Sequence, residues 1–166
     1  PAAPTAAPAP TAAPAPAPTR PPAATPPRPP ALAFGQVVEA GEWSVTVLRP
    51  EHLVPLSGGV GGFAPRGRFA LALVAVSNRG PAPAVIPPDL LELADARGER
   101  YAALPAASSA YLGAYERGLR GDLSMEEPIP PGAGILSVPV LFDVPLDASG
   151  LALYVRGAPA GWAFAR

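Results

Sequence analysis

The sequence predicts an antiparallel β-sandwich of about seven to nine strands, preceded by an extended N-terminal arm rich in proline, alanine and threonine. Three observations lead to this all-β fold class. Short apolar stretches alternate with polar residues in a period of two. Turn signals recur roughly every 8–12 residues. Finally, the helical crossovers that a parallel sheet requires are missing from the pattern.

The arm comprises residues 1–30, which hold 13 of the 27 prolines and otherwise contain only alanine, threonine and two arginines. Nothing in this stretch offers a large apolar side chain whose burial would offset the entropy cost of ordering the chain. Closely spaced prolines favour polyproline II geometry. We therefore divide the chain into a proline-rich arm or linker, 1–30, and a β-sandwich domain, 31–166.

Four threonines mark the arm: Thr5, Thr11, Thr19 and Thr25. Each stands beside proline or alanine, which is the composition of O-glycosylated stalks. They are candidates for glycosylation or for contacts in an assembly. The plainer alternative is that the arm is only a spacer.

The first strands are expected at 34–40 and 42–49, joined by a glycine turn. Trp43, Val45 and Val47 fall on one face of the second strand and polar residues fall on the other. This alternation is typical of a strand with one buried face. Residues 50–67 follow as a glycine-rich loop that is too long for a tight hairpin.

The next stretch, 68–77, is apolar on both faces, which predicts a central strand covered on each side. A turn follows at 78–81. Short strands are then expected at 84–86 and 90–94, and a hairpin turn at 95–98 leads into a strand at 99–102.

Residues 105–121 are ambiguous. Tyr111, Leu112 and Tyr115 have helical spacing, but one proline and three glycines limit any helix to two or three turns. After this stretch the pattern predicts a short edge strand at 123–125 and a turn at 128–132.

Two strong strands are expected near the C-terminus, at 134–144 and 150–156. They carry the long apolar runs that a buried sheet requires. Beyond them, Trp162 is expected to cover one end of the core.

Composition argues against several functional classes. The net charge is −1, and no basic stripe provides an electrostatic basis for binding nucleic acid. The chain has no cysteine, so disulfides and thiol chemistry are excluded. No stretch approaches the roughly 20 apolar residues of a transmembrane segment. The chain opens with Pro1, so we expect that a signal peptide or lipid anchor has been removed.

Candidate chemistry is sparse. His52 is the single histidine, and Ser57 is a loose candidate for its partner in a triad, so a surface loop position is the simpler interpretation. One histidine and one methionine are too few ligands for zinc or copper. We therefore expect no catalytic residue, no metal and no cofactor, and predict that the protein is not an enzyme.

Carboxylates were weighed as a calcium site. The local clusters are Glu126 with Glu127, and Asp143 with Asp147, but neither has the spacing of a calcium loop. A solvated strand end for the glutamates and a turn cap for Asp143 are the simpler interpretations. The glycines of 58–62 lack the Gly-Lys-Ser/Thr ending of a phosphate loop, so we expect a flexible connection there.

Three tyrosines form the candidate binding surface. Tyr101, Tyr111 and Tyr115 have the amphipathic rings that serve sugar and protein contacts. The alternative is that these rings partly cover one end of the sandwich.

Several segments carry a resemblance to a known family: 41–47 (GEWSVTV), 68–80 (RFALALVAVSNRG) and 140–145 (VLFDVP), together with Pro131-Gly132 and the turn from Asp95 to Tyr101. On these segments the chain, over about 34–157, resembles the immunoglobulin-like domain of unassigned function found in bacterial secreted proteins and lipoproteins. Its fold is similar to that of a small secreted immunoprotective antigen. The resemblance implies an immunoglobulin-like sandwich and carries over no catalytic residue. The loop 50–67 and the stretch 101–121 depart from the family pattern.

Two functions follow as hypotheses. The first is an extracellular or cell-surface structural protein that self-assembles into a filament, stalk or surface layer, with the arm contacting neighbouring copies. Open sheet edges that accept an extended segment motivate this view. The second is a monomeric binding module tethered to the envelope by the arm. Glycans and envelope components are further candidate partners.

Overall fold

The alternation around Gly41 produces the first hairpin of the sandwich. In the computed structural model, which describes residues 31–164, strand β1 (Val37–Ala40) pairs antiparallel with β2 (Trp43–Thr46). A two-residue turn joins them, and Gly41 has a φ of 61°. Type II′ turns require positive φ at their first central position, which glycine adopts without steric cost.

The longest strand, β4 (Arg68–Asn78), organises the first sheet. Strands β2 and β3 (Leu53–Leu56) pair end to end along one edge of β4. Strand β7 (Leu136–Val144) pairs along the other edge, in antiparallel register from Arg68 opposite Val144 to Val76 opposite Leu136. With β1, this gives a five-stranded sheet.

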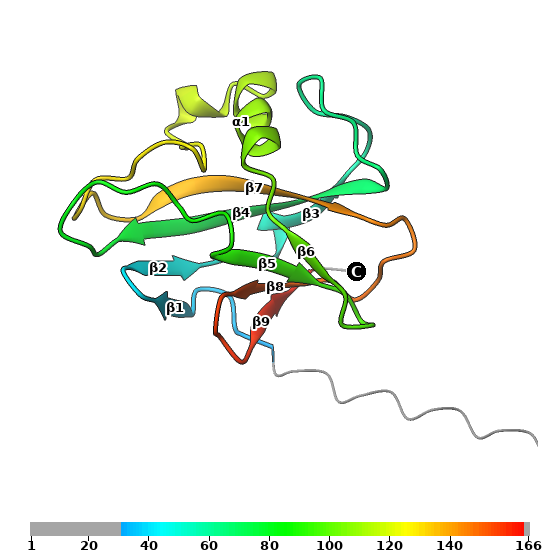
Figure 1. Cartoon of the computed structure of the whole chain (residues 1–166), viewed down its shortest axis with the longest axis horizontal. Coiled ribbons are helices and arrows are strands. Elements are labelled where there is room, and N and C mark those ends of the chain that lie inside the picture. The colour runs from blue at the N-terminus through cyan, green and yellow to red at the C-terminus, as the bar shows by residue number, and fades with distance from the viewer. Residues whose placement is uncertain (1–30, 165–166) are drawn as a thin grey trace, which may run out of the picture.

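The second sheet has four strands in the order β6-β5-β8-β9, all antiparallel. Their bounds are β5 (Leu91–Ala94), β6 (Arg100–Ala102), β8 (Ala152–Val155) and β9 (Gly161–Ala163). Figure 1 shows this sheet lying across the five-stranded one, with the helix on the far side of the larger sheet. The predicted antiparallel β-sandwich is thus confirmed.

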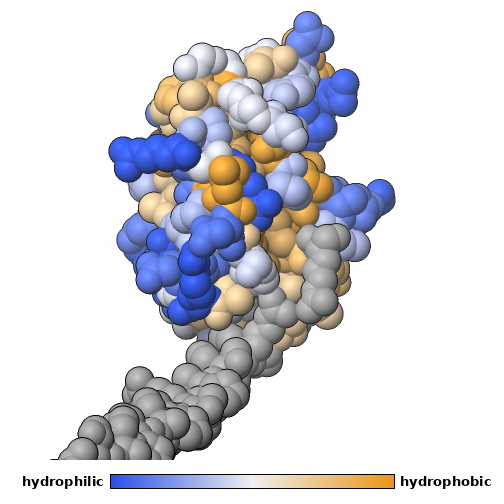
Figure 2. Space-filling model, turned by 90° about the vertical axis from the view of Figure 1, so that its right-hand side faces the viewer, coloured by the Kyte–Doolittle hydropathy of each residue, from blue (hydrophilic) through white to orange (hydrophobic). Residues whose placement is uncertain are grey.

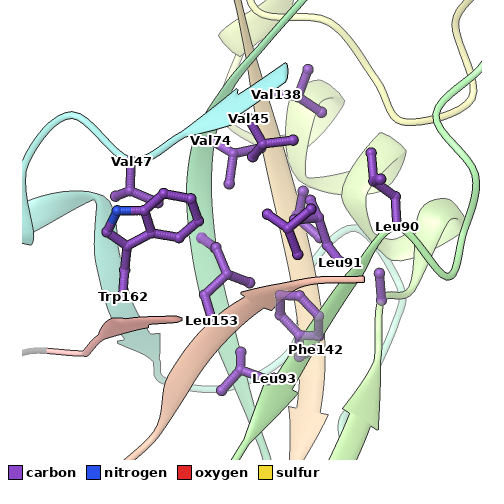
Figure 3. Close-up of a cluster of buried hydrophobic side chains, with 14 of the residues drawn as sticks. Val45, Val47, Val74, Leu90, Leu91, Leu93, Val138, Phe142, Leu153 and Trp162 are labelled. Carbon is purple, nitrogen blue, oxygen red and sulfur yellow. The ribbon is translucent and has the colours of Figure 1, made fainter. Parts of the chain in front are cut away.

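The main core is the apolar cluster between the two sheets, and it contains 24 buried residues. Alternate residues of β4, such as Val74 and Val76, point into it, as does Phe142 of β7. Figure 3 shows Trp162 at one side of this cluster, near Val47. The indole is fully buried, so the prediction that Trp162 covers one end of the core is confirmed.

A second apolar cluster, called here the helix cluster, lies on the opposite face of the five-stranded sheet. Its buried members are Val60, Phe69, Leu71, Ala107 and Leu141. Strand β4 therefore contributes to both clusters, with alternate residues pointing to opposite faces. This confirms the prediction that a strand apolar on both faces is covered on each side.

The cover of the helix cluster is α1 (Pro105–Ala114), and the short 3₁₀ helix η2 (Arg117–Arg120) follows it in the chain. A second 3₁₀ helix, η1 (Pro50–His52), precedes β3. Helix α1 begins with proline at its first turn, a position that needs no backbone donor. Its ten residues match the predicted limit of two or three turns.

Three local predictions were wrong, and one strand was not predicted. The 50–67 loop contains β3, and the C-terminal segment beyond the predicted strands forms β9. Residues 84–86 are no strand, because their only ladder contact is the bridge from Ala84 to Ile129 and two prolines follow. Residues 123–125 are not a strand either. There the Ser124 hydroxyl and the Glu127 carboxylate accept nearby backbone N–H groups, which favours a turn.

Candidate functional site

The three predicted tyrosines lie in two places. Tyr111 on α1 and Tyr115 just after it bring their ring centroids to 4.6 Å at an interplanar angle of 34°. Tyr101 is on β6, opposite Leu93, and its hydroxyl donates to Asp95 Oδ2 at 3.2 Å. The structure therefore brings two of the three rings together and places the third in the other sheet.

A groove of about 360 Å³ lies beside Tyr111, between α1, η1 and the outer face of the five-stranded sheet. Its floor is apolar and its rim is polar, with lining residues that include Val54, Leu71, Leu73, His52, Tyr111 and Arg117. Arg117 is paired with Asp122. Burial raises the pKa of Tyr111, so its hydroxyl stays protonated at neutral pH and can donate a hydrogen bond.

His52 ends η1 and contributes to the rim of this groove. Ser57, its candidate partner in a triad, lies in the exposed loop after β3. In the part of the chain that the structure describes, no three or more histidine, aspartate or glutamate side chains are grouped so as to hold a metal ion.

The glycine-rich segment 58–62 folds into a tight turn under α1. Val60 and Phe63 exchange two backbone hydrogen bonds of 2.8 Å, and Val60 is buried in the helix cluster. A Cβ added at Gly61 would lie 2.8 Å from Ala110 Cβ, so the turn packs directly on the helix. This arrangement gives the glycines a packing role.

Asp95 is the most highly bonded carboxylate in the described residues. Its side chain is fully buried, and it accepts hydrogen bonds from Arg97 Nε at 2.9 Å, from the backbone N–H groups of Arg97 and Glu99, and from the Tyr101 hydroxyl. Burial alone would raise the pKa of Asp95, but these donors outweigh it and hold the pKa below its ordinary value. The pKa of Tyr101 is raised, mainly by burial and then by its hydrogen bond to Asp95, which outweigh the opposing effect of Arg97.

The Asp95 network is structural. Arg97 also reaches Asp147 Oδ2 at 2.9 Å and so ties the β5–β6 hairpin to the turn before β8. The sequence predicts the turn at 95–98, whereas this network was not predicted. The available signal was an aspartate at the first position of a hairpin turn, where its carboxylate accepts backbone donors two and four residues on.

Hydroxyl groups attach α1 to the rest of the protein. Ser109 Oγ lies 2.5 Å from Ser124 Oγ and bonds the Glu126 carboxylate, while Glu127 accepts the Ser124 backbone N–H at 2.9 Å. The paired glutamates that were weighed as calcium ligands therefore bond protein donors in this turn. Asp143 accepts the backbone N–H groups just before β4, consistent with a cap on that turn.

Two sides of the sandwich are closed by backbone contacts. On one side, β6 runs on to Ala103, which bridges to Phe142, and the backbone N–H of Leu104 donates to the Leu141 carbonyl at 2.8 Å. On the other side lies a strap formed by residues 31–36. Its Leu32 N–H donates to the Gly161 carbonyl at 2.9 Å.

The strap crosses from the second sheet to the first. The indole Nε1 of Trp162 donates to the Ala33 carbonyl at 3.1 Å, and Gly35 N–H donates to the Val47 carbonyl at 2.8 Å. The first residues of the strap, 31–33, are therefore attached to β9. The threonine candidates Thr5, Thr11, Thr19 and Thr25 lie outside the described residues.

Strand β1 is an open edge of the sandwich. It pairs with β2 on one side, and within residues 31–164 no strand pairs with its other side. The edge strand β3 contains Pro55, which has no N–H to donate. Exposed apolar side chains are otherwise scattered, and on the face drawn in Figure 2 they lie among polar ones.

No helix of the described residues is long and apolar enough to cross a membrane. No protein-family model matches the chain, and no curated protein matches it. Among solved structures, the sandwich is similar to MPT63, a secreted protein from Mycobacterium tuberculosis, with a TM-score of 0.50 at 14% sequence identity. The match covers 82% of this chain and 98% of MPT63. The likeness is one of fold. It confirms the immunoglobulin-like β-sandwich.

Proposed function

We propose that the protein is a non-enzymatic extracellular or cell-surface structural module that self-assembles, with its proline-rich arm contacting neighbouring subunits. The observation that carries the proposal is the open edge of β1, which has no paired strand on its outer side within residues 31–164. Exposed edges accept extended segments from other chains. The arm supplies such a segment in every copy.

The cellular location rests on two observations of different kinds. MPT63, which shares the fold, is a secreted protein by its description. The arm has the composition of O-glycosylated extracellular stalks, and Thr5, Thr11, Thr19 and Thr25 are the residues proposed to carry the sugars. Both favour a filament, stalk or surface-layer subunit outside the cytoplasm.

The test compares the full chain with a variant that lacks residues 1–30. The main core and the strap lie within residues 31–164, so the shortened protein is expected to fold. Analytical ultracentrifugation and electron microscopy should show concentration-dependent oligomers for the full chain and monomers for the variant. A full chain that stays monomeric throughout the micromolar range contradicts the proposal.

A monomer in both cases supports the second candidate, a binding module for which the arm is a spacer. The groove beside Tyr111 favours this alternative, because it combines an apolar floor with the hydrogen-bonding groups of His52 and Arg117. Tyr115 extends the aromatic surface next to it. Such a surface suits sugars or a protein segment.

A further inference from the structure

The open edge of β1 has a defined hydrogen-bonding pattern. Ala40 and Trp43 close the two-residue hairpin, so Ala40 and Val38 bond to β2. The alternation of an antiparallel ladder then turns the backbone N–H and C=O groups of Val37 and Glu39 away from β2. In agreement, Arg79 N–H donates to the Glu42 carbonyl at 2.7 Å, which fixes the alternation on the other side of β2.

The arm has a matching pattern in its sequence. From residue 2 to residue 20, every proline occupies an even position: Pro4, Pro8, Pro10, Pro14, Pro16 and Pro18. In an extended strand, successive residues direct their backbone N–H and C=O groups to opposite edges. A strand formed by residues 3–19 would therefore keep every donor along its odd edge and lose six donors along its even edge.

We infer that a short stretch of the odd-numbered edge of residues 3–19 pairs antiparallel with the open β1 edge, Val37–Ala40, of a second copy of this chain. This inference rests on the proposed self-assembly. It specifies which sheet edge receives the arm and which residues of the arm pair with that edge. Proline at non-bonding positions is compatible with an edge strand. The even edge, poor in donors, would then end the sheet and prevent a further strand from adding.

The side chains fit this pairing. In an antiparallel ladder, the odd residues share a face with Val37 and Glu39, which are exposed, and the even prolines share a face with Val38 and Ala40. Val38 and Ala40 are half-buried against the main core. The prolines would therefore extend the apolar rim of the core. The threonines, which are all at odd positions, would face solvent.

The arm is expected to pair with β1 of a second copy rather than with β1 of its own chain. The strap holds residues 31–33 on β9, so the arm cannot turn back directly onto β1. Six of the ten residues 21–30 are prolines, and prolines favour an extended spacer over a reversal. An extended spacer would carry residues 3–19 away from their own sandwich and towards a neighbouring copy.

The experiment uses two proline variants of the full chain. The odd variant, T5P/A9P/A13P/A17P, removes every second backbone N–H along the odd edge of residues 3–19. Since the even edge already has six prolines, neither edge then keeps two neighbouring N–H donors, that is, donors two residues apart in the sequence. The even variant, A2P/A6P/A12P, fills the remaining even positions up to residue 18 and leaves every odd donor in place. Both raise the proline content, so they separate edge chemistry from stiffness. Sedimentation velocity should show the dissociation constant raised at least about tenfold in the odd variant and within about twofold of the original in the even variant.

A Val37→Pro variant tests the acceptor. It removes an outward donor while Ala40 and Val38 still bond to β2, and it is expected to weaken assembly as the odd variant does. Thermal unfolding checks its fold, and the arm variants decide the question if it fails to fold. Equal assembly by the odd and even variants overturns the inference. If arm deletion abolishes assembly in that case, the proposed function stands; if the full chain is monomeric, the proposed function fails first.

Discussion

The main core and the helix cluster use the same strands but have different surroundings. Strands β4 and β7 alternate between the two, so that Phe142 points into the main core and Phe69 into the helix cluster. The main core is enclosed by two sheets and holds 24 buried residues. The helix cluster holds five buried residues and depends on one short helix for its cover.

Helix α1 is attached to the sheet mainly through side chains. Ser108 Oγ donates to the Leu104 carbonyl at 3.0 Å and accepts the buried Leu141 N–H at 3.0 Å. Its neighbour Ser109 bonds the turn that holds Ser124. Sheet ladders, by contrast, link every strand of the main core. The sandwich is therefore expected to unfold as one cooperative unit, whereas α1 is expected to open on its own at a lower free-energy cost.

The largest expected effect comes from truncating the two buried phenylalanines. Phe142→Ala leaves a cavity that both sheets enclose, and we expect the free energy of unfolding to fall by about 4–5 kcal/mol. Phe69→Ala should cost about 3 kcal/mol, because the helix can settle into part of the space. Urea unfolding measures both variants. Equal costs would show that the helix is held as rigidly as the sheets.

A matched pair of valines gives the next effect. Val60→Ala and Val74→Ala each remove two buried methyl groups, from the helix cluster and the main core respectively. Each change should cost about 1–2 kcal/mol by the burial term. Hydrogen exchange separates them: Val60→Ala should lower the protection of α1 amides alone, whereas Val74→Ala should lower protection throughout the sandwich. Uniform loss in both variants would contradict the idea of an independent helix.

Sequence reasoning predicted the main core well because period two is visible wherever one face is buried. It also predicted that 68–77 is covered on both sides, but not by what. The missing part is physical: Leu56 and Phe69 in neighbouring strands only become one surface once β3 pairs with β4. Strand β3 itself was hidden, since its proline lowers the strand signal in a glycine-rich context.

The candidate site was less predictable. Spacing suggested that Tyr111 and Tyr115 share a helix face, and they do contact each other, but the position of Tyr101 depended on its hydrogen bond to Asp95. The groove beside Tyr111 includes η1 and β4, which lie far from it in the chain. Contacts between such distant segments leave no local pattern in a single sequence.

The smallest expected effect concerns Asp95, at the β5–β6 hairpin that borders the main core. Its folded pKa lies below the ordinary value of 3.8. The folded state therefore binds fewer protons there than the unfolded state, and the stabilisation is present above the unfolded pKa and lost as pH falls through the folded pKa. We expect Asp95→Asn to be less stable by about 1 kcal/mol at pH 7, since hydrogen bonds to a charged acceptor are stronger than those to a neutral one. Urea unfolding at neutral and acid pH should show this gap closing below about pH 4.

Asp147→Asn is the matched control: it removes the exposed partner of the same arginine and should change stability by less than about 0.5 kcal/mol at any pH. A gap that persists in acid would mean that shape rather than charge sets the contribution of Asp95 to the hairpin.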